Sequence, residues 1–317
     1  MLINIFKSNQ KVISLLVLFL SILLWIPSFW VDQSSVINQN LSFHISNKII
    51  VFVVASIIIG LQAIYLNYIV NEFKLLSSQT HLPALLFIIL NAGISTLMVF
   101  SPLLIVNILI LIAFHQMLLM YNQNNAFAIS FNIGFLIAIA TLIYFPVILI
   151  FLLLWIALLY TKSPNWRGLV IAVLGFSVPV MFYVAYYFLT DQLSHLITFG
   201  WGGYRIFNLT AIPSSLLARS FFITLLLIGL FASLNLFKAI AIHVVKIKKH
   251  LILVILLFLL LLSTLLLNSK DYLATYTLLT IPLAIVIASF LNNIKKKWLT
   301  ELVFLLLLMS ILVGYFS

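Results

Sequence analysis

The residues with the clearest capacity for chemistry are charged side chains at the ends of long apolar segments. Asp32, Asp191 and Asp271 each lie at such a boundary, and Arg219 lies one turn inside the apolar segment that begins near residue 215. A positioned carboxylate can act as a general base. The planar guanidinium of arginine binds phosphate or carboxylate through two parallel hydrogen bonds. Asp271 is adjacent to Lys270, and an exposed pair of this kind simply marks a helix end, so the candidates narrow to Asp32, Asp191 and Arg219.

Each of these three candidates has two interpretations. An ionised side chain at the centre of a membrane helix costs about 2.5 to 3.5 kcal/mol, and less near the interface. The guanidinium of Arg219 therefore either reaches outward to lipid phosphates or faces the protein interior, where Asp191 or a ligand phosphate would pair with it. Asp32 and Asp191 either mark the ends of membrane spans or contribute to a site.

The segment 199–207 combines three glycines with aromatic and basic side chains. Glycine lets backbone approach a ligand closely, while Trp201 and Tyr204 offer flat faces on which sugar rings or lipid chains stack. Arg205 adds a second cation. The same composition is typical of an interfacial aromatic belt, which needs no ligand. The alternative is that this segment forms a lid or re-entrant loop over a binding site.

The sequence carries no motif for a metal or a cofactor. Cysteine is absent, and the six histidines form no pair spaced for a shared helix face. Thiolate metal sites, disulfides and thiol nucleophiles are therefore excluded, and the Gly-rich phosphate, zincin, serine-hydrolase and dinucleotide motifs are absent. We expect no metal and no cofactor. The net charge of +11 is better explained by membrane orientation than by nucleic-acid binding.

Composition indicates the elements that must position these residues. Of the 317 residues, 65% are hydrophobic and 7% are charged, whereas soluble domains carry roughly 25% charged residues. The chain is therefore predicted to be an all-α, polytopic transmembrane helical bundle. With about 20 apolar residues per membrane helix, eleven spans are predicted, at residues 12–31, 49–70, 82–100, 102–120, two within 126–160, 167–189, 215–245, 251–267, 272–291 and 298–316.

The count of eleven depends on one helix break. Residues 126–160 form an apolar stretch too long for one span. Tyr144-Phe145-Pro146 divides it, because proline lacks a backbone donor and disfavours helix in the preceding residue. No small-xxx-small packing motif and no inverted repeat stands out along the chain.

The distribution of cations predicts the orientation. With the amino terminus in the cytoplasm and the carboxyl terminus outside, twelve of the sixteen lysines and arginines lie on the inner side, as the positive-inside rule requires. We expect one integral membrane domain over residues 1–317, with its longest outer loops at 32–48 and 190–214.

Several segments resemble a bacterial family of multi-pass proteins of unknown function. The resemblance covers about residues 80–192 and lies in four segments that begin at His81, Ser101, Gly134 and Asn165. It implies a protein of the bacterial cytoplasmic, or inner, membrane.

A second resemblance, in topology, is to the GT-C glycosyltransferases, which use polyprenyl-phosphate sugars on the outer membrane face. In that superfamily an acidic residue in the first outer loop is catalytic, and Asp32 occupies that place here. The first outer loop of this chain is shorter and lacks a second adjacent acid. The resemblance implies transfer of a sugar in cell-envelope glycan assembly, with membrane lipid and a polyprenyl-phosphate-linked sugar as partners.

These observations lead to one site hypothesis and two function hypotheses. Asp32 is the expected catalytic base, and the expected substrate-binding residues on the same outer face are Asp191, Trp201, Tyr204, Arg205 and Arg219. The alternative is a non-catalytic membrane protein, either a lipid or small-molecule transporter or flippase, or a scaffold subunit that binds a protein partner in an envelope complex.

Overall fold

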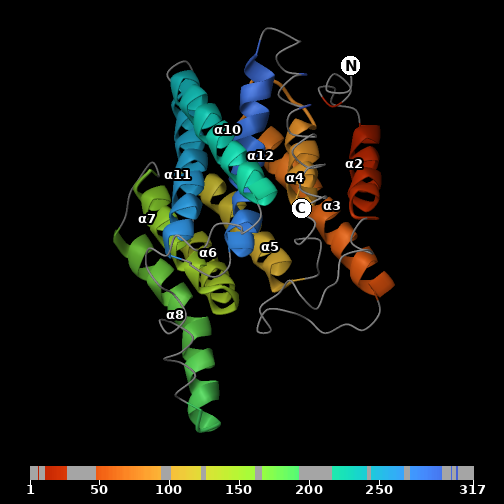
Figure 1. Cartoon of the computed structure of the whole chain (residues 1–317). Helices are drawn as coiled ribbons and strands as arrows, with labels where there is room; N and C mark the ends of the chain where they lie inside the picture. The colour runs from red at the N-terminus through yellow and green to blue at the C-terminus, as the bar shows by residue number, and fades with distance from the viewer. Residues whose placement is uncertain are drawn as a thin grey trace. The chain divides into compact units, whose positions relative to one another are not determined.

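The computed structural model describes residues 6, 11–26, 48–93, 101–122, 126–160, 166–192, 216–240, 244–267, 272–294, 301 and 305. Within these ranges the regular structure is helical, with no strand (Figure 1). The helices are α2 (Lys11–Leu24), α3 (Lys48–Glu72), α4 (Leu82–Ala92), α5 (Pro102–Leu119), α6 (Ala126–Ile143), α7 (Ile150–Leu159), α8 (Trp166–Leu189), α10 (Leu216–Ile240), α11 (Val245–Leu267) and α12 (Tyr272–Asn293), with short 3-10 helices η4 (Met120–Asn122) and η5 (Phe145–Leu149).

Four described helices are long and apolar enough to cross a membrane. The qualifying segments are Ile49–Glu72 in α3, Pro102–Leu119 in α5, Trp166–Leu189 in α8 and Tyr276–Asn293 in α12. Shorter apolar helices accompany them, at Val12–Leu24, Leu82–Ala92, Phe127–Ile143, Phe145–Leu159 and Ile223–Phe237. The prediction of an all-helical protein is thus confirmed for the described residues, and four of its helices are long and apolar enough to span a membrane. The predicted span at 298–316 lies largely outside the described residues.

Three of the described prolines lie in the first turn of a helix, whereas Pro179 and Pro282 lie inside α8 and α12. Tyr144 has extended backbone angles, φ −142° and ψ 101°, and the helix resumes as η5 with Pro146 in its first turn. Pro83 and Pro102 stand at the starts of α4 and α5, where the missing backbone N–H costs nothing. The interruption between α6 and α7 is therefore at the predicted position.

The chain divides into two compact units. Unit 1 comprises residues 1–104, 212–255 and 279–317, and unit 2 comprises residues 105–211 and 256–278. In unit 1, helices α2, α3 and α4 contact one another. Gly60 of α3 lies against α2, where a Cβ atom would come within 2.6 Å of Leu18 Cδ2 and 2.8 Å of Ser21 Oγ.

The main contact of unit 2 is between α6 and α8. Their backbones approach so closely that a Cβ atom on Gly134 would overlap the carbonyl oxygen of Ala172, and one on Gly175 would overlap that of Phe131. The buried positions of α8 are Gly168, Ala172, Gly175 and Pro179. Small residues at this spacing are the usual means of close helix packing in membranes. The small-residue pattern was missed in the sequence.

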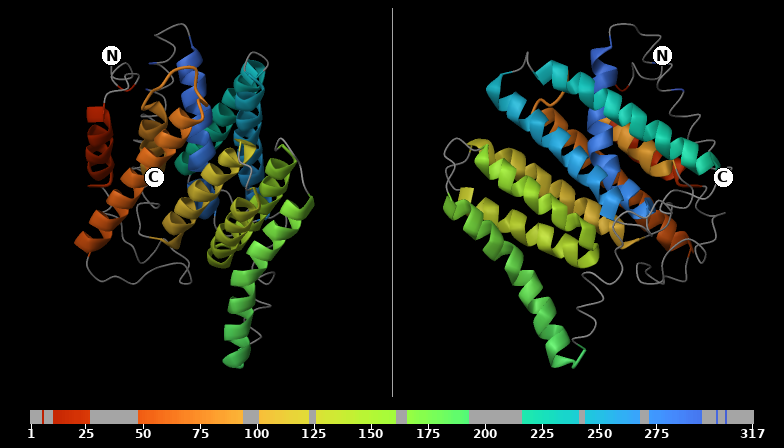
Figure 2. Two further views of the ribbon diagram at one scale, coloured as in Figure 1. Left: turned by 180° about the vertical axis from the view of Figure 1, so that it is seen from behind. Right: turned by 60° about the vertical axis from the view of Figure 1, so that its left-hand side comes forward.

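The C-terminal half of α8 runs on beyond α6, as Figure 2 shows. Its large apolar side chains are exposed, with Phe182 at 75%, Phe188 at 64% and Leu189 at 80%. Exposed apolar faces of this extent are unusual on a soluble monomer and suit a helix surrounded by hydrocarbon.

Candidate functional site

The residues of the predicted outer site fall mostly outside the described part of the chain. Asp32, Trp201, Tyr204 and Arg205 lie outside it. Arg219 lies in the first turn of α10, as expected for a residue one turn inside that helix, but only its backbone is described. Asp191 is described and exposed, so it is the one predicted site residue whose surroundings are defined.

Asp191 has a clear structural role at the end of α8. Its φ is 54°, in the left-handed region. The N–H of Asp191 donates to the carbonyl of Phe188 at 3.3 Å, and that of Gln192 donates to the carbonyl of Tyr187 at 3.0 Å. These two bonds define a Schellman motif, in which the residue after the helix takes a left-handed conformation and satisfies terminal carbonyls. The position of Asp191 is therefore explained by helix termination, and its carboxylate remains exposed.

The polar residues inside the apolar helices differ in burial. Gln62, Asn91 and Asn107 are buried, whereas Asn132 is exposed. The amide nitrogen of Gln62 donates to the carbonyl of Leu104 at 2.7 Å. Asn91 donates to Thr280 Oγ1 at 3.3 Å, and Asn107 donates to the carbonyl of Thr277 at 3.1 Å. These amides form hydrogen bonds between helices, as polar groups inside helical membrane proteins commonly do.

The second left-handed residue of the described chain ends α3. Lys74 has φ 51°. The N–H of Lys74 donates to the carbonyl of Asn71 at 3.3 Å, and that of Leu75 donates to the carbonyl of Val70 at 3.0 Å. Val70 and Leu75 are both buried, which adds the apolar contact typical of a Schellman motif. Lysine thus occupies a position that glycine usually takes.

Residues 73–81 form the turn between α3 and α4, here called the α3–α4 turn. Asn71 closes it with two hydrogen bonds to Thr80: its Nδ2 donates to the Thr80 carbonyl, and the Thr80 N–H donates to its Oδ1, both at 3.3 Å. Asn67 Nδ2 lies 3.1 Å from His81 Nδ1. The N–H of His81 donates to the carbonyl of Phe6 at 2.7 Å. The turn is therefore held from both of its ends.

The α3–α4 turn also contacts the end of α12. Ser77 Oγ donates to Asn293 Oδ1 at 3.2 Å, and Ser78 Oγ donates to Asn292 Oδ1 at 3.0 Å. The Nδ2 of Asn292 in turn donates to Ser77 Oγ at 2.8 Å. This network joins residues more than 200 positions apart in the sequence, all of them in unit 1.

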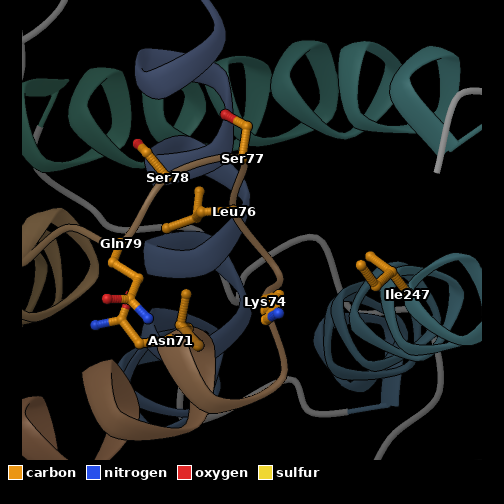
Figure 3. A pocket seen from close by; sticks show the side chains of 8 residues that line it. Asn71, Lys74, Leu76, Ser77, Ser78, Gln79 and Ile247 are labelled. Atoms are coloured by element: carbon orange, nitrogen blue, oxygen red, sulfur yellow. The ribbon is translucent and has the colours of Figure 1, made fainter. Parts of the chain in front are cut away.

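The start of α11 packs against the α3–α4 turn in unit 1. The ring of His250, which is buried, meets Phe73 edge to face at a centroid distance of 5.2 Å. Between the turn and α11 lies a pocket of about 310 Å³. Figure 3 shows Lys74 on the side of the turn nearer Ile247. The residues that line the pocket are Val70, Asn71, Lys74, Leu76, Ser77, Ser78, Gln79 and Ile247.

The lining of this pocket was not anticipated from the sequence. The sequence alone indicates that Lys74 lies on the inner face, and that Lys246, Lys248 and Lys249 anchor the chain to anionic headgroups of the inner leaflet. The polar run Ser77-Ser78-Gln79-Thr80 between two apolar segments was the available signal. It became informative only with the contacts to α11 and α12, which a single sequence does not reveal.

The described helices define an all-helical protein with helices long and apolar enough to cross a membrane. The chain belongs to a family of unknown function, DUF6427, whose model matches residues 1–317. No curated protein and no solved structure matches it. Among the described residues, no group of three or more histidine, cysteine, aspartate or glutamate side chains is arranged to hold a metal ion.

Proposed function

We propose that the chain is a multi-pass protein of the bacterial cytoplasmic membrane, with eleven spans, its amino terminus in the cytoplasm and its carboxyl terminus outside. Three helix ends of unit 1 support this topology. The end of α3, the start of α11 and the end of α12 meet at the α3–α4 turn. The lysine distribution assigns all three to the cytoplasmic side, and they carry Lys74, Lys246–Lys249 and, just beyond α12, Lys295–Lys297.

The number of membrane crossings between two neighbouring segments, which must be even, supports the count of eleven spans. Because the α3–α4 turn and the start of α11 lie together, an even number of spans must separate them. The described helices between them are α4, α5, α6, α7, α8 and α10. They supply six spans if the break at Tyr144–Pro146 separates two crossings, and five if it does not. The extended backbone of Tyr144 favours six.

For its activity, we propose an outer-face transferase of the GT-C type that takes a sugar from a polyprenyl-phosphate carrier. Asp32 acts as general base toward the acceptor hydroxyl, Arg205 and Arg219 bind the lipid phosphate, and Trp201 and Tyr204 stack on the sugar. The observation that carries this proposal is the position of two charges at described helix ends. The exposed carboxylate of Asp191 follows α8, at the start of the predicted outer loop 190–214, and Arg219 lies in the first turn of α10, just after the end of that predicted loop.

The test replaces the proposed base while keeping its size. A positioned base contributes about 100- to 10,000-fold to rate, so Asp32→Asn at normal abundance is expected to nearly abolish transfer to outer-surface glycans. Glu72→Gln is the matched control, since it removes an exposed carboxylate at the opposite membrane face and should leave the glycans unchanged. Unchanged glycans in Asp32→Asn would contradict the transferase proposal.

A second candidate, transport of a lipid or small molecule, is favoured by buried polar groups in the helices. The amide oxygens of Gln62 in α3 and Asn107 in α5 are buried and have no hydrogen-bond partner among the described residues. Transporters place polar groups near the membrane midplane to receive substrate or ions. Lipid movement measured in reconstituted vesicles, with Asp32→Asn alongside the wild type, separates the two candidates, because a transporter does not need a general base.

A further inference from the structure

We propose that the pocket beside the α3–α4 turn binds a phosphate group. This site is distinct from the outer-face residues and does not depend on the activity proposed for them. It lies wholly within unit 1. Its volume of about 310 Å³ is at the lower end of the roughly 300–1,000 Å³ typical of small-molecule sites. A pocket of this size accommodates a headgroup rather than a whole lipid.

The charges around the pocket favour an anion. Lys74 lines it, and no carboxylate is among the lining residues in the described part of the chain. Ile247, on the facing side, stands between Lys246 and Lys248 in the first turn of α11, and both of these lysines are exposed. The first turn of a helix presents backbone N–H groups and the positive end of the helix dipole. Glu72 is the nearest carboxylate in the sequence, and it interacts with Tyr68 instead.

Lys74 differs from Asp191 in that its left-handed backbone places a lysine on the wall of a pocket. A left-handed residue after a helix is usually glycine, because a Cβ atom disfavours that conformation. Outliers of this kind concentrate at functional positions. The Schellman motif places Lys74, an exposed lysine, on the pocket wall.

The remaining wall is preorganised by hydrogen bonds. The bonds of Ser77 and Ser78 with Asn292 and Asn293 hold one side of the pocket, and the two bonds between Asn71 and Thr80 hold another. A rigid wall lowers the cost of ordering a site when a ligand binds. Thr80 itself is fully buried behind this wall and is not one of the residues that line the pocket.

The lining is divided between polar and apolar groups. Val70, Leu76 and Ile247 supply apolar surface, and the other lining residues are polar. A phosphate monoester or diester at the interface matches this division, with its oxygens toward Lys74 and its carbon substituent toward the apolar side. The phosphate has two possible sources, a lipid headgroup in the adjacent leaflet or a free phosphate compound.

The experiment uses the full-length protein and measures ligand-dependent thermal stabilisation. One arm adds inorganic phosphate to the protein in detergent, with chloride at equal ionic strength as the reference. The other arm compares nanodiscs of digalactosyldiacylglycerol, a bilayer lipid without phosphate, with nanodiscs that also contain phosphatidylglycerol. We expect the wild type to be stabilised in at least one arm. The arm that responds identifies the source: nanodiscs alone indicate a lipid phosphate, and detergent alone indicates free phosphate.

Two substitutions to glycine test whether phosphate binds at Lys74 itself. Lys74→Gly relieves the left-handed backbone and removes the ammonium group, so it should melt at a higher temperature than the wild type without ligand. Its phosphate affinity should nevertheless fall by at least about ten-fold, as expected for loss of a hydrogen bond to a charged group. Asp191→Gly makes the same backbone change at the other Schellman motif and is the reference for thermal stability alone, since it should raise the unfolding temperature without removing a lysine. Lys74→Arg should retain binding.

Two results would overturn the proposal. One is a wild type that responds in neither arm. The other is a Lys74→Gly variant whose response equals that of the wild type, which would show that phosphate acts elsewhere. Because Lys74→Gly is expected to be the more stable protein, loss of its response cannot be attributed to unfolding. The outcome is also independent of the glycan phenotype of Asp32→Asn.

Discussion

Lys74 and Asp191 occupy the same position in two different helix caps. Each is the residue that follows the C-terminal cap of its helix, with φ of 51° and 54° respectively, and each is followed by a residue whose N–H bonds back to the helix at 3.0 Å. Both side chains are exposed. The two differ in their surroundings, since Lys74 lines a pocket and Asp191 follows the exposed half of α8.

Replacement of either residue by glycine is expected to stabilise the protein. The left-handed conformation costs a residue with a Cβ atom roughly 1–2 kcal/mol, which glycine avoids. Glycine also loses more backbone freedom on folding, which offsets roughly 0.5–1 kcal/mol of this gain. A net gain of about 0.5–1 kcal/mol follows for Lys74→Gly and for Asp191→Gly. Thermal unfolding in detergent checks this. A fall in the midpoint for both variants would contradict the assigned caps.

The close approach of α6 and α8 predicts that glycine-to-alanine substitutions at different positions of these helices have different effects on stability. Gly134→Ala and Gly175→Ala each introduce a Cβ atom that overlaps a backbone carbonyl of the facing helix, and overpacking of this kind costs about 1–3 kcal/mol. In Gly168→Ala the nearest atom is Leu158 Cδ2 at 3.2 Å, the end of a flexible side chain that can move.

The expected ranking is that Gly168→Ala unfolds near the wild-type temperature, while Gly134→Ala and Gly175→Ala unfold at lower temperatures and are cleaved faster by protease. Equal stability of the three variants would show that α6 and α8 do not pack through these positions.

Asn107 tests whether a buried amide serves stability or transport. Hydrogen bonds between membrane helices are worth about 0.6 kcal/mol on average and at most about 1.7. The amide of Asn107 makes one bond, to the carbonyl of Thr277, and leaves its oxygen without a partner among the described residues. Asn107→Leu should therefore change the unfolding free energy by less than about 2 kcal/mol. If the protein moves a lipid, transport in vesicles should be lost while the fold is kept. Asn132→Leu, at an exposed position, is the control.

Hydrophobicity and proline positions were sufficient to predict most helices. The predicted segments 49–70, 102–120 and 272–291 correspond to α3 (Lys48–Glu72), α5 (Pro102–Leu119) and α12 (Tyr272–Asn293). These features are local, because a helix in hydrocarbon must satisfy its backbone within the segment. Proline likewise acts on its own turn, so the break before Pro146 was predictable.

The contacts between helices were not predictable in the same way. The bonds from Ser77 and Ser78 to Asn293 and Asn292 depend on long-range packing. The left-handed backbone of Lys74 could not be predicted from the sequence, because lysine rarely adopts this conformation. The pattern of Gly168, Ala172 and Gly175 was visible in the sequence but was overlooked, and only the proximity of α6 gives it meaning. The predicted outer site, apart from Asp191 and the backbone of Arg219, lies outside the described residues and stays a prediction.

The most direct test of the proposed topology uses the absence of cysteine in the chain. Single cysteines are introduced at two exposed positions, Gln192 after α8 and Lys248 in the first turn of α11, and spheroplasts are treated with a membrane-impermeant maleimide. The eleven-span topology predicts that Gln192→Cys is labelled on intact spheroplasts, and that Lys248→Cys is labelled only after the membrane is permeabilised. Labelling of both from the same side, or the reverse pattern, would contradict it.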